Sequence, residues 1–248
     1  LLGWCRFRQG RNSDALSAFT RSLDLAPDNA EALEGLARAS ARLGRDKQAL
    51  DAVVTLSRLH PEVDVGDVAS QVLSRPGSLE DHRLGRGRKP EGEPGMVSRA
   101  RGDYFEVRRN GGPWEPIFVK GINLGAALPG RYPAEFPREQ ALYAKWLLQM
   151  SEMGANGVRL YTLLPPEFYR ALGKHNAGRG SGDGFIWLVQ GVWTELPEDD
   201  ISYDAPAFRA QFVAEMERVI DAVHGNIAVA HRRGHASGFY DTDVSEMT

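Results

Sequence analysis

The chain has 248 residues, 42% of them hydrophobic and 25% charged, with a formal net charge of −3. So small a net charge argues against a protein that binds nucleic acid or an anionic membrane surface, and there is no run of about 18 apolar residues that would predict a membrane span. The one cysteine, Cys5, excludes an intramolecular disulfide and falls in a helical pattern, so we expect a packed thiol.

Residues 1–61 contain an internal repeat with a period of 34 residues. The pairs in this register are Leu2 and Leu36, Gly10 and Gly44, Ala15 and Ala49, Phe19 and Val53, and Pro27 and Pro61. The pattern resembles the tetratricopeptide repeat, a helix–turn–helix unit, although Arg6 and Ser40 stand where an aromatic residue is usual. With a capping helix over 62–75, the resemblance implies a helical-repeat domain at 1–75. Such a domain is either a concave surface for a protein partner or a helical spacer and assembly module.

A segment rich in glycine, proline and charge follows at 76–101. Its lack of apolar periodicity predicts a flexible linker, and its interleaved acids and bases favour a solvated tether over a nucleic-acid-binding arm. Beyond the linker, the segments 104–108 and 116–120 flank Asn110-Gly-Gly-Pro113, which predicts a β-hairpin.

The sequence next predicts a βαβ unit: a buried strand ending near Asn123, an amphipathic helix over 138–153 and a second strand over 156–161. Such units form parallel sheets with right-handed crossovers, so the carboxyl ends of both strands meet at one edge. The polar side chains expected at that edge are Asn123, Arg159 and Tyr161.

After a helix over 166–174, the nearly all-apolar segment 185–190 predicts a third strand, buried on both faces. Residues 207–223 form the clearest helical pattern in the chain. The tail, 224–248, is expected to be polar and loop-like.

Three stretches together resemble the first strands of a glycoside hydrolase (β/α)8 barrel: KGINLG, MGANGVRLYTLLPPEFYRAL and FIWLVQGVW. The similarity is closest to glycoside hydrolase families 2 and 5 and extends over residues 102–248. It implies an α plus α/β protein in which helical repeats precede the amino-terminal part of a TIM barrel. A complete barrel takes about 250 residues, so the domain is expected to be incomplete. The sequence also starts inside an amphipathic pattern and ends without a stop signal, so we expect a piece of a longer protein.

The resemblance implies a carbohydrate-active enzyme, a glycoside hydrolase or transglycosylase that acts on the O-glycosidic bonds of an oligo- or polysaccharide. Its retaining mechanism uses two glutamates, which are expected beyond Thr248. Arg159 stands where the family has an arginine that supports the catalytic nucleophile; the alternative is a structural ion pair of a buried guanidinium. No cofactor is expected. The alternative function is a non-catalytic scaffold or sugar-binding protein that uses the repeats for protein partners.

Five further side chains are candidates for contact with a sugar: Asn123, Tyr161, Gln190, Trp193 and Glu195. Asn123 and Tyr161 can hydrogen-bond hydroxyl groups; the alternatives are an Asx turn and packing at the rim. Gln190 and Trp193 stand at the end of the third strand, and the indole either stacks on a sugar ring or packs under its loop. Glu195 lacks a second carboxyl group at the separation of about 5 Å that a retaining enzyme needs.

His231 and His235 have the i, i+4 spacing of some metal ligands. A glycine and two arginines lie between them and disfavour a bound cation, so no metal site is expected. Residues 238–243 are expected to form a polar loop before a fourth strand, either lining the cleft or at the surface.

Overall fold

The computed structural model describes residues 2–75, 80–85, 97–109, 111–125, 127–180, 183–195 and 202–248. The chain divides into two compact units, the repeat unit and the sheet unit. The repeat unit comprises Leu1–Arg86, Ile227–Arg233 and Ser237–Phe239, and the sheet unit comprises Gly87–Asn226, Gly234–Ala236 and Tyr240–Thr248. Short segments near the carboxyl end of the chain therefore pack with the helices at its amino end.

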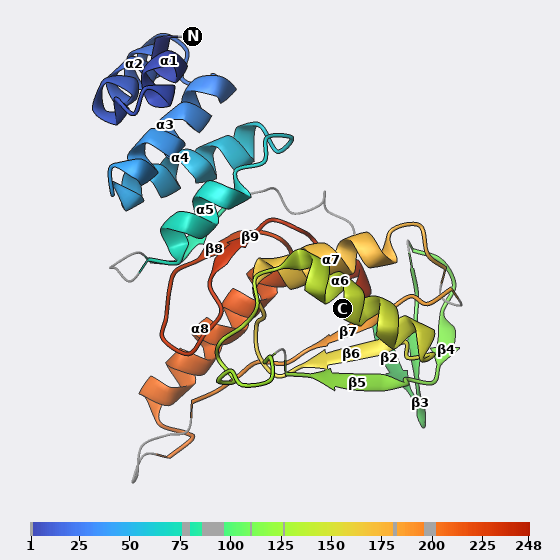
Figure 1. Ribbon diagram of the computed structural model, residues 1–248. Coiled ribbons are helices and arrows are strands. Elements are labelled where there is room, and N and C mark those ends of the chain that lie inside the picture. Colours follow the sequence, from blue (N-terminus) through green and yellow to red (C-terminus); the bar gives the residue numbers. More distant parts are fainter. Residues whose placement is uncertain are drawn as a thin grey trace. The chain divides into compact units, whose positions relative to one another are not determined.

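The repeat unit begins with five helices, coloured blue to cyan in Figure 1. They are α1 (Leu2–Arg8), α2 (Asn12–Leu25), α3 (Ala30–Arg42), α4 (Asp46–Leu59) and α5 (Gly66–Leu73). Consecutive helices pack against each other, as the predicted helix–turn–helix repeats require. The capping helix predicted over 62–75 is α5.

The 34-residue period has a visible structural basis. Gly10 and Gly44 lie in the turns that follow α1 and α3, with φ of 75° and 69°, a backbone conformation that favours glycine. Ala15 and Ala49 have no exposed surface, and their small side chains let neighbouring helices approach closely. Equivalent positions therefore have equivalent structural roles in the two repeats.

Cys5 differs from its prediction, because its thiol lies on an exposed part of α1. The buried residues of this helix are Gly3 and Phe7, four positions apart on one face. Cys5 lies between them in sequence and therefore points away from that face. The helical pattern was correctly recognised, but its buried face was not.

The tail also differs from its prediction. It forms the strands β8 (Ile227–Val229) and β9 (Gly238–Tyr240) and the short 3-10 helix η1 (Ser245–Met247). All residues of the two strands are buried. These strands join β1 (His82–Arg83) in a sheet of order β1-β8-β9, in which β1 and β8 are antiparallel. The predicted linker, 76–101, thus contains a strand at 82–83 and another at 98–101; its residues 76–79 and 86–96 lie outside the described residues.

The sheet unit starts with an antiparallel sheet of β2 (Ser98–Arg101), β3 (Tyr104–Val107) and β4 (Glu115–Ile117). The β3–β4 pairing confirms the predicted hairpin, although Asn110 of its turn lies outside the described residues. The first strand of this sheet, β2, was not predicted. It brings Arg99 to 2.6 Å from the carboxylate of Glu106, whose side chain is buried in β3.

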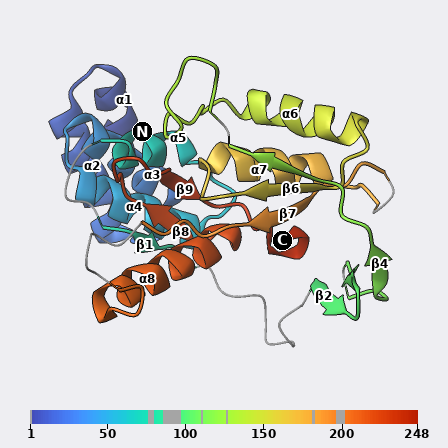
Figure 2. The same ribbon diagram turned by 90° about the horizontal axis from the view of Figure 1, so that it is seen from below.

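The second sheet of this unit is parallel and contains β5 (Gly121–Leu124), β6 (Gly157–Leu160) and β7 (Trp187–Gln190), in chain order. The crossover helices are α6 (Gln140–Glu152) and α7 (Pro166–Asn176), which Figure 1 shows on one side of the sheet. Figure 2 shows the three strands from another direction, together with α8 (Pro206–Val223). The order of elements in the predicted βαβ unit is confirmed, and a second crossover extends it. The burial predictions are wrong, because β5 has no buried residue and Val189 of β7 is 48% exposed on the face opposite to the helices.

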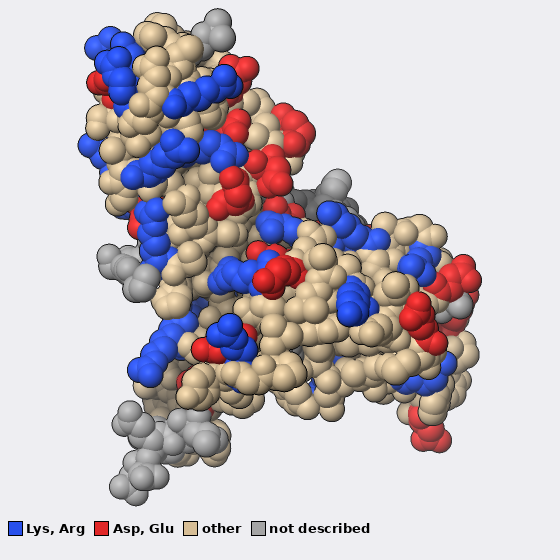
Figure 3. Space-filling view, in the orientation of Figure 1, with Lys and Arg blue, Asp and Glu red and all other residues tan. Residues whose placement is uncertain are grey.

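Both signs of charge occur on the face of the molecule shown in Figure 3, over the repeat helices as well as over the sheet unit. That face is therefore not a uniformly basic surface of the kind that binds nucleic acid. Within the described ranges, no helix combines the length and apolarity that a membrane span requires.

Candidate functional site

The parallel sheet aligns two of the predicted site residues. Asn123 of β5 is in register with Arg159 of β6, and Arg159 is in register with Val189 of β7. On either side of Arg159 along β6, Val158 and Leu160 are completely buried, whereas Arg159 is exposed. Because side chains alternate along a strand, Asn123 and Arg159 lie on the face opposite to α6 and α7. We call this face the open face.

Tyr161 joins Arg159 on the open face, because it follows two positions later along the chain. The guanidinium carbon of Arg159 lies 4.6 Å from the centre of the Tyr161 ring, a cation–π contact, and the Tyr161 side chain is 41% exposed. The prediction that these two residues share a face is confirmed. The alternative of a structural ion pair of a buried guanidinium does not fit the described residues, because Arg159 is exposed and its guanidinium keeps its hydration.

Gln190 does not join this group. It is in register with the buried Leu160, so its side chain points toward the helices. The hydroxyl of the buried Tyr169, on α7, donates a hydrogen bond of 2.8 Å to Gln190 Oε1, and burial raises the pKa of that hydroxyl. Gln190 Nε2 donates to the carbonyl oxygen of Gly191 at 2.8 Å. Gln190 therefore fixes the end of β7 from the helix side and does not face a ligand on the open face.

Trp193 and Glu195 lie in the loop after β7, and two contacts hold this loop. At its start, Gly191 N donates a 2.9 Å hydrogen bond to Leu160 O, at the end of β6. At Glu195, Oε1 lies 3.2 Å from Nε2 of His235, in an ion pair when the imidazole is protonated. The indole of Trp193 between these contacts is 50% exposed.

Sequence reasoning missed His235 as a partner of Glu195. The pair joins two loops, and no local pattern in the sequence reports such a contact. In the parts of the chain that the structure describes, no three His, Cys, Asp or Glu side chains gather as potential metal ligands. The His235 imidazole contacts the Glu195 carboxylate, which is itself 69% exposed.

Gly191→Ala will strain the loop that carries Trp193. A methyl group at this position would lie 2.5 Å from Leu160 O and 3.0 Å from Tyr161 O, so the loop must move away from β6. We expect a loss of about 1–3 kcal/mol in the free energy of unfolding and a changed Trp193 fluorescence. Urea unfolding and emission spectra measure both effects.

Gly125→Ala is the matched control, because Gly125 also follows a strand and an added methyl group would meet no atom of the described residues within 4 Å. Equal effects of the two substitutions would show that contact with β6 is not what requires glycine at position 191.

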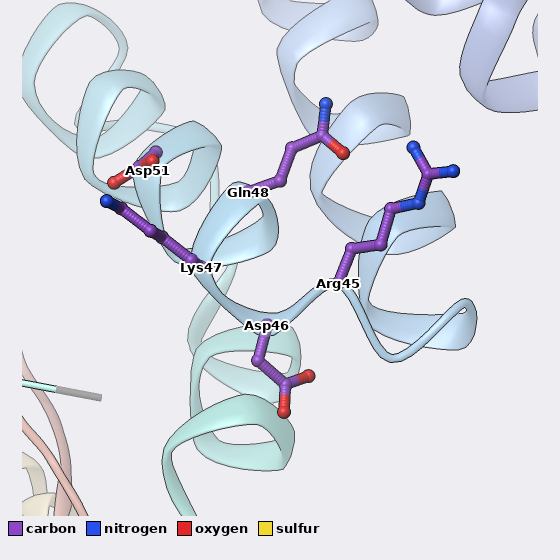
Figure 4. Close-up of a pocket in the computed structure, with 5 residues that line it drawn as sticks. All are labelled: Arg45, Asp46, Lys47, Gln48 and Asp51. Atoms are coloured by element: carbon purple, nitrogen blue, oxygen red, sulfur yellow. The ribbon is translucent and has the colours of Figure 1, made fainter. Parts of the chain in front are cut away.

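The repeat unit has a charged surface hollow of about 480 Å³, lined by Arg45, Asp46, Lys47, Gln48 and Asp51. Figure 4 shows that Arg45 and Gln48 point to one side, Asp46 to the opposite side, and Lys47 with Asp51 to a third, so the five side chains do not converge on a common ligand. Asp46 is also paired with Arg75, whose guanidinium donates a 3.0 Å hydrogen bond to Ala41 O. The hollow therefore has a structural ion pair at its edge, and the open face is the better candidate site.

Comparison with known protein families identifies the helical segment only. Residues 1–61 match the tetratricopeptide repeat. No match was found among curated proteins or among solved structures. The tetratricopeptide segment, as we now call residues 1–61, suggests a protein partner, because stacked repeats present extended surfaces for binding.

Proposed function

We propose that this chain is part of a carbohydrate-active enzyme that hydrolyses or transfers O-glycosidic bonds, by a retaining mechanism with two glutamates outside residues 1–248. One observation above all supports the proposal: Arg159 and Tyr161 stack on the open face of a parallel sheet, beside Asn123. They lie at the carboxyl end of β6, the position at which α/β barrels and open parallel sheets carry their active sites.

The proposal includes a (β/α)8 barrel. The strands β5, β6 and β7 lie in chain order in one parallel sheet, and α6 and α7 cover one of its faces. A barrel begins in this way, and its interior would then be the open face that carries Arg159. An interior position would give Arg159 the role of supporting a catalytic carboxylate, which the resemblance implies.

The side chains near this edge suit a sugar. The amide of Asn123 can both donate to and accept from hydroxyl groups, and Arg159 can donate to them. Tyr161 and Trp193 add exposed aromatic faces, which can pack against the C–H face of a pyranose ring. Glu195 contacts His235, but its side chain is 69% exposed, so its carboxylate can both hold the loop and accept a hydrogen bond from a sugar hydroxyl.

The proposed function is tested by turnover. The longest natural protein that contains this chain should release the aryl group from aryl glycosides or shorten glucose hexasaccharides, and the chain alone should bind them without turnover. The tetratricopeptide segment supports a second candidate, a scaffold or sugar-binding protein. Binding without turnover by the whole protein would favour that candidate, and absence of both binding and turnover would exclude both sugar-related functions.

Arg159→Lys should weaken sugar binding by about tenfold without lowering the melting temperature. A lysine ammonium cannot reproduce the planar fork of arginine or its stacking on Tyr161, whereas an exposed side chain contributes little to stability. Calorimetric titration with cellohexaose, laminarihexaose and maltohexaose measures the affinity.

Arg209→Lys is the matched control, since Arg209 is exposed on α8 and outside the open face. Unchanged affinity of Arg159→Lys would remove Arg159 from the site. Lost stability would instead support a structural role for this arginine.

A further inference from the structure

Each of the three loops that follow β5, β6 and β7 exposes a large aromatic side chain. These are Tyr132 at 77% exposure, Tyr161 at 41% and Trp193 at 50%. The three strands are parallel and adjacent, so the three loops leave the sheet at the same edge. Tyr132 was not among the residues predicted from the sequence.

Tyr132 is held by two successive proline-containing turns, although its side chain is exposed. In the first, Arg131 N donates to Leu128 O at 3.0 Å, with Pro129 at the second position and Gly130, at φ 79°, at the third. These are the residues that a type II turn requires.

The second turn begins at Tyr132 itself and has Pro133 at its second position. Glu135 N donates to Tyr132 O at 2.9 Å, and the Glu135 carboxylate accepts a 3.3 Å hydrogen bond from Tyr132 N. The backbone of Tyr132 is therefore fixed on both sides while its ring faces solvent. Such preorganisation lowers the entropic cost of binding a ligand on the ring.

We propose that Tyr132 is an outer ring-stacking platform, and that the ligand is a linear oligosaccharide that extends from the sheet to this loop. The inference rests on the proposed function and adds the length of the ligand to it. Arg159 and Asn123 bind the hydroxyl groups of an inner sugar, beside Tyr161. A monosaccharide or disaccharide occupies only these inner positions, whereas a longer chain also stacks on Tyr132.

The test compares chain lengths on the protein as it is. Cellohexaose, laminarihexaose and maltohexaose present the same pyranose with three linkages, and their disaccharides cellobiose, laminaribiose and maltose serve as short probes. We expect at least one hexasaccharide to bind more tightly than its disaccharide. Tyr132→Ala should weaken the affinity for that hexasaccharide by about tenfold and leave the affinity for the disaccharide unchanged.

Tyr104→Ala is the matched control, because Tyr104 is 50% exposed but lies on β3 in the antiparallel sheet. Tyr132→Phe keeps the ring and should bind as the unmodified protein does. If a hexasaccharide binds and Tyr132→Ala binds it equally well, the platform is refuted while the proposed function stands. If no sugar binds, the proposed function and the platform both fail.

Discussion

Phe19→Ala will lower the free energy of unfolding of the tetratricopeptide segment by about 3–5 kcal/mol. The Phe19 ring is 4% exposed and packs edge-on against Trp4, with 5.3 Å between ring centroids. A methyl group on Gly3 or Gly35 would lie 2.5 or 2.3 Å from Cε1 of this ring. The ring therefore fills the space that two glycines leave between α1, α2 and α3, so its truncation opens a cavity there.

Hydrogen exchange of α2 and α3, followed by mass spectrometry, measures this loss in the complete chain. The control is Leu25→Ala on the same helix, where the side chain is 89% exposed and the expected change is within about 0.5 kcal/mol. A loss below about 1 kcal/mol for Phe19→Ala would mean that the core of the repeats tolerates a cavity, against the close packing described here.

The repeats were predictable because their signals are local and occur twice. Gly44 repeats the turn of Gly10, and Ala49 repeats the close helix approach of Ala15. The parallel sheet was predictable for a related reason, since each βαβ step carries an apolar strand, an amphipathic helix and a turn in sequence order. Both predictions depend on patterns that extend over a few tens of residues at most.

The β1-β8-β9 sheet could not be predicted in this way. Its strand β1 has two residues, His82 and Arg83, and it pairs with Ala228 and Ile227 near the other end of the chain. Asp81 adds a long-range contact, because its Oδ1 accepts a 2.9 Å hydrogen bond from Ala230 N. Two polar residues carry no strand periodicity, so only the folded chain reveals that they form part of a sheet.

The candidate site was predicted only in part, because some of its contacts also join parts of the chain that are distant in sequence. Strand alternation correctly put Arg159 on the face opposite to Val158 and Leu160, because it needs only the sequence of one strand. The partner of Arg159 on β7 depends on the register between strands, which makes it Val189 and puts Gln190 on the helix side. The contact of Glu195 with His235 depends on the paths of two loops.

Asn176→Ala will destabilise the sheet unit by about 3 kcal/mol. Asn176 is the last residue of α7 and is 2% exposed. Its Nδ2 donates to Ile186 O at 2.8 Å, and its Oδ1 accepts from Ile186 N at 3.0 Å, so the side chain joins the end of the helix to the residue before β7. Ile186 is completely buried, so both of its backbone groups lose their partner where water does not replace it.

Asn156 provides a control of the same chemistry at a wetter site. Its Oδ1 accepts from Lys120 N at 2.7 Å and its Nδ2 donates to Phe118 O at 2.9 Å, but Lys120 and Phe118 are exposed, so water can hydrate their backbone groups after truncation. We expect Asn156→Ala to cost about 1 kcal/mol or less, and urea unfolding together with exchange of the Ile186 amide measures the difference. Equal losses in the free energy of unfolding for the two substitutions would contradict this explanation. The two sites differ in whether the backbone groups that lose their hydrogen bonds are buried or exposed.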